Sequence, residues 1–160
     1  IRRDKRRELL ADLLLDLGGR MLRVRHAGAA HTTEDLVVHD PATGVLFTGD
    51  VVFRGRVPYV GNADSGRWIA AINRMLDLKP QLLVSGHGPV SSEPAADLAQ
   101  TREYLSFLRK TMGDAARNLE PFDEVYARTD WSAFAGLPLF AAVNRMNAYN
   151  TYLLMESAGR

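Results

Sequence analysis

Three side chains that can bind a metal each stand at the end of an apolar, β-rich stretch of the chain. They are His31, Asp50 and His87. The apolar runs are residues 36–38 and 45–47 around the first two, and residues 82–84 before the third. Neutral imidazole and carboxylate are nitrogen and oxygen ligands that suit Zn²⁺. Because loops at one end of a sheet can converge while the strands hold them rigid, these residues are candidate metal ligands.

Each of the three residues also has a plainer explanation when it is taken alone. His31 is typical of a surface or hydrogen-bonded core histidine, Asp50 of a turn residue, and His87 of a loop residue. Their order and their places at strand ends together favour a metal site. Glycines beside Asp50 and on both sides of His87 let the backbone approach closely and leave these side chains accessible. Two metals roughly 3.5–4 Å apart can share a hydroxide and lower its pKa towards neutrality.

The segments AHTTEDLVVHDPATGVLFTGD (30–50) and LLVSGHGPV (82–90) resemble the second half of a metallo-β-lactamase-fold zinc hydrolase. The resemblance implies an α/β fold, namely the C-terminal half of an αββα sandwich with an added C-terminal helical tail. It implies that His31 binds one zinc ion with two further histidines, that Asp50 bridges both zinc ions, and that His87 binds the second. A hydroxide held between the metals would attack an ester, thioester, amide or phosphate.

Two departures from the family pattern affect this interpretation. The clustered His-x-His-x-Asp-His motif of the first half is nowhere in the sequence, so no complete catalytic set is expected in this chain. Glu34 stands where family members often have glycine, which puts the local turn in question. Of the remaining histidines, His39 is expected to be exposed or structural. His26, near a strand end, is a weaker candidate for contact with the site.

A closer resemblance covers GDVVFRGRVPYVGNADSGRWIAAINRML (49–76) and residues 147–156. These segments look like the zinc metallohydrolases of quinoprotein relay systems, related to SoxH-type proteins. That branch implies a periplasmic protein whose leader is missing here, with a cytoplasmic location left open. Arg54, Arg56 and Tyr59 lie in the loop where superfamily members place substrate-facing residues. They are predicted to bind substrate, the alternative being a solvated or structural loop.

Composition is that of a globular protein long enough to bury a core. The 160 residues are 46% hydrophobic and 24% charged, and the net charge of +1 favours neither nucleic acid nor a membrane surface. Without cysteine, any metal site must use nitrogen and oxygen ligands. No apolar run approaches the ~18 residues of a membrane span. The basic cluster at residues 2–7 indicates the polar side of a helix rather than a nucleic-acid patch, and Ile1 suggests a chain cut from something longer.

The elements that must position the candidate ligands follow from periodicity and turn residues. The sequence predicts an amphipathic helix over 2–17, strands over 21–25, 36–39 and 45–48, and a loop over 51–63. Next come a helix capped by Asp64 or Ser65, a buried strand over 81–84, and a helix that begins after a Ser92 cap and ends at about 112. Two or three helices, broken at Gly136 and Pro138, complete the chain. Residues 1–115 are expected to form the partial domain and residues 116–160 a helical extension.

Three hypotheses about function remain open on the sequence alone. The first is an incomplete zinc hydrolase acting on a small-molecule substrate, although iron and manganese are compatible with the same ligands. The second is a non-catalytic binding or assembly module that retains half of a metal site. The third is association of two half-chains, either as a homodimer or with a separate N-terminal half, because one face of a half-sheet needs cover.

Overall fold

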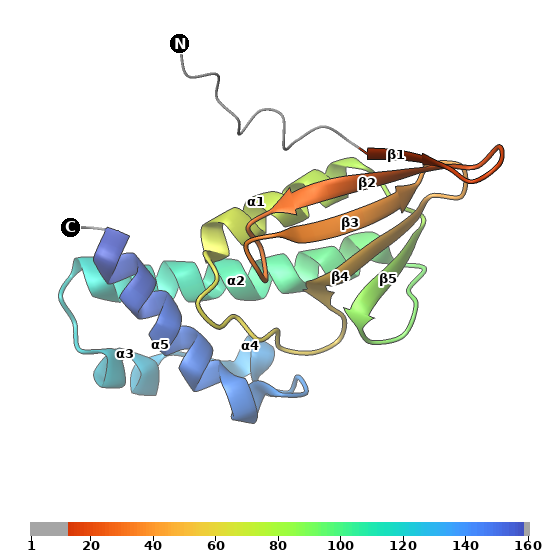
Figure 1. Cartoon of the computed structure of the whole chain (residues 1–160). Coiled ribbons are helices and arrows are strands. Elements are labelled where there is room, and N and C mark those ends of the chain that lie inside the picture. Colours follow the sequence, from red (N-terminus) through yellow and green to blue (C-terminus); the bar gives the residue numbers. More distant parts are fainter. Residues whose placement is uncertain (1–12, 159–160) are drawn as a thin grey trace, which may run out of the picture.

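A computed structural model of the protein describes residues 13–158 and contains one five-stranded sheet with five helices in that range (Figure 1). The strands are β1 (Leu13–Asp16), β2 (Met21–Gly28), β3 (Asp35–Asp40), β4 (Val45–Phe53) and β5 (Leu82–His87). The helices are α1 (Ser65–Asp77), α2 (Pro94–Arg117), α3 (Phe122–Arg128), α4 (Ser132–Ala135) and α5 (Phe140–Ala158). The expected α/β architecture with a helical C-terminal region is confirmed.

The strands lie in the sheet in chain order, β1 to β5. The first four pair as antiparallel neighbours, whereas β4 and β5 are parallel. Parallel pairing requires a crossover, which α1 supplies. The side chain of Asp64 caps α1 by accepting hydrogen bonds from the amides of Gly66 and Arg67, so the predicted cap is confirmed.

The N-terminal helix prediction is wrong for the part that the structure describes. Leu13–Asp16 forms β1 and pairs with β2, while residues 2–12 lie outside the described range. Gly18 and Gly19, which follow the predicted helix, make a hairpin turn, in which the Gly19 amide donates to the Asp16 carboxylate at 2.9 Å. A short apolar run has no periodicity of its own, so the pairing partner decides its structure.

Other boundaries differ by a few residues. Strand β4 continues to Phe53 and β5 continues to His87, because the two pair beyond the predicted ends, with Phe53 opposite His87. The predicted loops at 51–63 and 85–89 are correspondingly shorter. Helix α2 begins at Pro94 and has no side-chain cap, and Ser91 rather than Ser92 accepts a hydrogen bond from the Glu93 amide.

The two faces of the sheet are covered differently. Helices α1 and α2 contact β2 and β4, respectively, and lie over one face, where Val37, Leu46 and Leu83 are buried (Figure 1). Side chains of directly paired residues share a face. The opposite face carries a row of paired apolar residues that crosses the sheet. Two residues of this row, Leu13 and Phe47, are 58% and 43% exposed, respectively. The row is Leu13, Val24, Val38, Phe47 and Val84. We call it the open face.

The C-terminal helices pack on α2 and share its core. Helix α5 contacts α2 along its length, and one continuous cluster of buried residues includes Leu105 of α2, Phe134 of α4 and Ala148 of α5. Residues at helical spacing on one face of α2, among them Leu98, Leu105 and Leu108, are buried. The division into two regions after residue 115 therefore stays a prediction. In the structure, one hydrophobic core includes residues from both sides of that position. Among residues 13–158, no helix has the length and apolar character needed to cross a membrane.

Candidate metal centre

The topology brings the three predicted ligands to one end of the sheet. His31 lies in the loop after β2, Asp50 lies near the end of β4, and His87 is the last residue of β5. Because β3 is antiparallel to both its neighbours, β2 and β4 run in the same direction, and β5 is parallel to β4. The carboxyl ends of β2, β4 and β5 therefore meet at this end.

Asp50 and His87 form a close pair across the two parallel strands. The distance from His87 Nε2 to Asp50 Oδ1 is 3.4 Å, and the two side chains are 46% and 43% exposed, respectively. Within residues 13–158 this is the one polar contact of the Asp50 carboxylate. An imidazole nitrogen and a carboxylate oxygen that face each other in solvent, with free lone pairs, are suited to a shared divalent cation.

The missing side chain of Gly86 makes room for this pair. A Cβ at Gly86 would lie 2.0 Å from Asp50 Oδ1 and 2.8 Å from the carbonyl carbon of Gly49. Only glycine lets the Asp50 carboxylate lie across β5 beside His87. The close approach that the sequence predicted around these ligands is thus present at Gly86.

His31 lies among aromatic rings. Its ring centroid is 5.5 Å from that of Phe53, 5.5 Å from that of Trp68 and 6.4 Å from that of Tyr59. Its Nδ1 is buried and has no hydrogen-bond partner among the described residues. Since a buried polar atom without a partner is costly, this nitrogen is available to a ligand that the described part of the chain does not supply.

Phe53 separates His31 from the Asp50–His87 pair. Its ring stacks on His87 at 4.8 Å, with an angle of 25° between the ring planes, and contacts His31 with another edge. Within residues 13–158, no three histidine, aspartate or glutamate side chains lie close enough to hold a metal ion together. The donor set therefore fits part of a zinc site: two ligands converge, and His31 stands apart with an unpartnered nitrogen.

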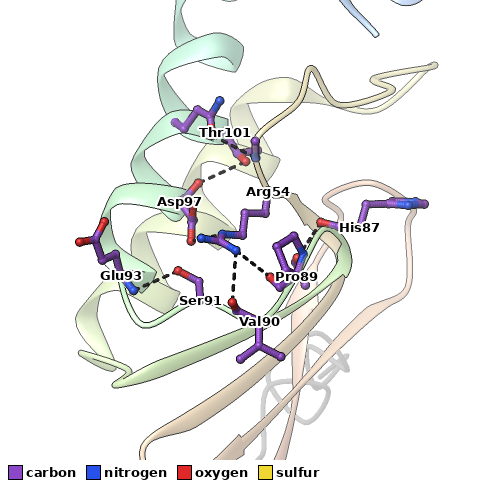
Figure 2. A network of polar contacts seen from close by, with 11 residues as sticks. Arg54, His87, Pro89, Val90, Ser91, Glu93, Asp97 and Thr101 are labelled. Atoms are coloured by element: carbon purple, nitrogen blue, oxygen red, sulfur yellow. Dashed lines mark hydrogen bonds and ion pairs between the residues drawn. The ribbon is translucent and has the colours of Figure 1, made fainter. Parts of the chain in front are cut away.

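Arg54 fastens the segment that follows His87. Its guanidinium donates to the Asp97 carboxylate at 3.1 Å and to the carbonyls of Pro89 and Val90 at 3.1 and 3.2 Å. Its backbone amide donates to the His87 carbonyl at 3.1 Å. Figure 2 shows the His87 imidazole directed away from this network. Arg54 thus holds the backbone of the ligand, and its predicted contact with substrate stays a prediction.

The other two predicted substrate residues occupy the same loop. Tyr59 is 46% exposed beside His31, so its ring borders the site. Arg56 is partly buried, and its Nε has no hydrogen-bond partner among the described residues. A cavity of about 390 Å³ opens beside His31, between Thr32 and Thr33 on one side and Asn62 and Arg67 on the other.

The remaining histidines lie away from the pair. His39 is buried on the helix-covered face, in agreement with a structural role. His26 lines a different cavity, with Arg25 and Arg74, and its Nε2 is 3.4 Å from the Glu34 carboxylate. The backbone of Glu34 does not have a positive φ. The turn therefore does not need glycine at this position, and Glu34 causes no backbone strain there.

Sequence reasoning missed three residues that shape the site. Phe53 was placed in a loop, although an aromatic residue three positions after Asp50 extends the β-rich pattern and could have indicated a longer strand. Asp97 and Asn147 carry no local signal. Asp97 accepts a hydrogen bond from Arg54, 43 positions away in the sequence, and Asn147 accepts one from Val60, 87 positions away. Only the fold reveals such pairs.

Comparison with known proteins identifies the superfamily of the chain. A family model described as the metallo-beta-lactamase superfamily matches residues 2–87, which is more than half of the chain. A solved metallo-beta-lactamase from Pontibacter korlensis is 31% identical, with a TM-score of 0.53 over 60% of this chain and 46% of that one.

Two further solved structures extend the comparison. The DIM-1 metallo-beta-lactamase, exposed to ceftazidime, is 25% identical, with a TM-score of 0.52 over 60% of this chain and 44% of that one. An archaeal metallo-beta-lactamase superfamily protein from Sulfolobus tokodaii, 23% identical with a TM-score of 0.50 over 59% and 37%, supports the fold alone. The chain spans less than half of the length of each of these three proteins.

Proposed function

Because the chain belongs to the metallo-β-lactamase superfamily, a superfamily that includes hydrolases, we propose that it supplies one part of the active site of a zinc-dependent hydrolase. The observation that carries the proposal is the Asp50–His87 pair, which meets at the carboxyl ends of two parallel strands. The two side chains make no other hydrogen bond or ion pair among the described residues. Function commonly lies at such strand ends, where rigid elements hold exposed ligands.

Asp50 and His87 would hold zinc, and the unpartnered Nδ1 of His31 is a further candidate ligand that lies apart from this pair. Bound zinc lowers the pKa of water and so supplies a nucleophile at neutral pH. The protein residues orient this chemistry. Phe53 fixes the plane of the His87 ring by stacking, and Trp68 supports His31 while its own indole donates to the Val51 carbonyl at 2.9 Å. The ligands missing here would come from a His-x-His-x-Asp-His segment.

The substrate class proposed is a small molecule with an ester, thioester or amide bond. Tyr59 and the cavity beside His31 offer an aromatic and polar border for it. The quinoprotein relay branch, and with it a periplasmic location, stays part of the proposal and rests on the sequence resemblance. Iron or manganese in place of zinc remains compatible with the same nitrogen and oxygen ligands.

The open face supports a second candidate, an assembly module. A row of exposed and half-buried apolar side chains across five strands is a surface that another polypeptide can cover. We propose that the cover is the half of the fold that carries the missing ligands. A second copy of the chain, which would form a homodimer, is the competing occupant.

Metal content measured by elemental analysis tests the first proposal. The full-length protein is purified without chelator and compared with Asp50→Ala, His87→Ala and the surface control Asp123→Ala. Zinc bound to the parent and the control, but lost from the two ligand variants together with ester or thioester hydrolysis, is the expected result. Zinc retained at the parent level in both ligand variants would overturn the assignment. Analytical ultracentrifugation of the same samples distinguishes a homodimer from a monomer.

A further inference from the structure

The loop beside His31 is held by a helix that is distant in the sequence. Asn147, in α5, binds the backbone on both sides of Tyr59. Its Oδ1 accepts from the Val60 amide at 2.9 Å and its Nδ2 donates to the Pro58 carbonyl at 2.7 Å. One side-chain amide therefore satisfies a donor and an acceptor of the loop, as a neighbouring strand would.

Two further bonds from the C-terminal region hold the same loop. Asn150 Nδ2 donates to the Gly61 carbonyl at 2.8 Å, and the Val57 amide donates to the Pro138 carbonyl at 3.0 Å. Four hydrogen bonds thus restrain residues 57–61, and each has its other partner in residues 138–150.

Asn147 cannot shift alone, because it belongs to a buried chain of hydrogen bonds. Its Nδ2 also donates to the Tyr104 hydroxyl at 3.0 Å, and that hydroxyl donates to Asn144 Oδ1 at 3.0 Å. Asn144 Nδ2 in turn donates to the Tyr126 hydroxyl at 3.1 Å. Burial raises the pKa of Tyr104 and keeps it a neutral hydroxyl. Breaking one link leaves a buried polar group unpaired, so the network has one favoured arrangement.

We propose that α5 sets the position of Tyr59 beside His31, and that Asn147 and Asn150 are positioning residues of the candidate site. The consequence of this inference for substrate binding rests on the proposed function. Tyr59 stands between two anchored residues, and its ring is 6.4 Å from the His31 ring. With 46% of its surface exposed, it presents an aromatic wall to the apolar part of a small-molecule substrate.

Asn150→Ala in the full-length protein is the deciding variant, because Asn150 is only partly buried and the change removes one hydrogen bond to the loop. Hydrogen exchange of the amides in residues 57–61 should accelerate about fivefold, the effect of losing one net hydrogen bond. The imidazole NMR resonances of His31 should shift, while those of His26, His39 and His87 stay in place. Asn73→Ala is the matched control, since it also removes a single side-chain hydrogen bond, from Arg102.

Two further variants make the result specific. Tyr59→Leu should reproduce the shift of the His31 resonances with unchanged exchange in residues 57–61, because the ring is lost while the anchors remain. Asn147→Ala should give a larger acceleration than Asn150→Ala. If Asn147→Ala fails to fold, Asn150→Ala still decides the question.

The outcomes separate this inference from the proposed function. A folded Asn150→Ala protein with unchanged exchange in residues 57–61 and unchanged His31 resonances would overturn the positioning role, whether or not zinc binds. Zinc binding unaffected by Asp50→Ala and His87→Ala would overturn the proposed function and leave the exchange and NMR results standing. If the protein hydrolyses an aryl ester, Asn150→Ala should raise KM more than it lowers kcat.

Discussion

Asp40 and Asp50 stand at opposite ends of the sheet and differ in almost every contact. The Asp40 carboxylate accepts from the Thr43 hydroxyl at 2.7 Å, the Arg20 Nε at 2.8 Å and the Ala42 amide at 3.0 Å. Hydrogen bonds from Thr43 and Arg20 lower the pKa of Asp40 to about 2. Asp50 has the His87 contact alone among the described residues.

The difference teaches which end of the sheet is built for stability and which for binding. At the Asp40 end, donors from the β3–β4 turn and from Arg20, which precedes β2, compensate the charge, so the carboxylate stabilises the fold. At the Asp50 end, the lone pairs are left for a group from outside the described chain. A metal or substrate can bind to an exposed carboxylate whose oxygens have unused lone pairs, because no internal contact has to break first.

The largest expected effect is loss of zinc from Asp50→Asn. Its affinity for zinc should fall by more than the roughly 10- to 100-fold typical of removing an outer-shell partner, because a ligand itself is lost. With zinc removed from both proteins, the urea midpoint of the variant should equal that of the parent. Competition with a chromogenic zinc chelator measures the affinity. Asp40→Asn should bind zinc like the parent, and equal losses in both variants would break the comparison.

Gly86→Ala should weaken zinc binding indirectly. The new methyl group would occupy the space of Asp50 Oδ1 and displace the carboxylate from His87. We expect a loss of affinity of roughly 10- to 100-fold, in the range of disturbed ligand orientation. Gly136→Ala is the matched control, because a Cβ there meets nothing within 4 Å. Parent-level affinity in Gly86→Ala would contradict the close approach described above.

Arg54→Met should have a smaller effect on the same end of the sheet. It removes the bonds to Asp97, Pro89 and Val90 that hold the segment after His87 (Figure 2). Zinc affinity should fall about tenfold, at the lower end of outer-shell effects. The control Arg145→Met removes an exposed ion pair with Asp123 and should leave affinity unchanged. A larger loss in Arg54→Met than in Asp50→Asn would instead indicate direct contact with the bound group.

The smallest effect concerns pH and the Asp40 end. The pKa of Asp40 is about 2 in the folded protein against an ordinary value of 3.8, so its stabilising contribution is present above about pH 4. That contribution is lost as the pH falls from about 4 to 2. Urea unfolding should therefore show the parent more stable than Asp40→Asn at pH 6, with the difference shrinking below pH 4. A constant difference across this range would show that the hydrogen bonds do not favour the ionised form.

Much of the fold follows from local sequence signals. Asp64 caps α1 as expected, and α1 and α2 form close to the ranges that periodicity predicts. The run at residues 13–15 was assigned to the wrong element because a short stretch of leucines suits a helix and a strand equally well. Its pairing with β2 decides the structure, and pairing is not a property of the run itself.

The site could be predicted only in part for a similar reason. His31, Asp50 and His87 were expected at one end of the sheet, and the order of the strands places them there. Their separation could not be predicted, because Phe53 lies between His31 and His87 only once β4 continues past Asp50. The sequence could likewise not reveal that Asn147 contacts Val60. Long-range contacts depend on the packing of α5, which no local pattern encodes.

The anchoring of the Tyr59 loop by α5 also has a consequence for biosynthesis. Val60 and its acceptor Asn147 are 87 positions apart, so the ribosome must add that many residues before the bond can form. At about 5–20 residues per second, this interval lasts roughly 4–17 s. Once residue 87 has been added, the nascent sheet can hold Asp50 beside His87, whereas Tyr59 still lacks its anchor in α5. The proposed metal ligands and the Tyr59 ring therefore reach their final positions at separate times during translation.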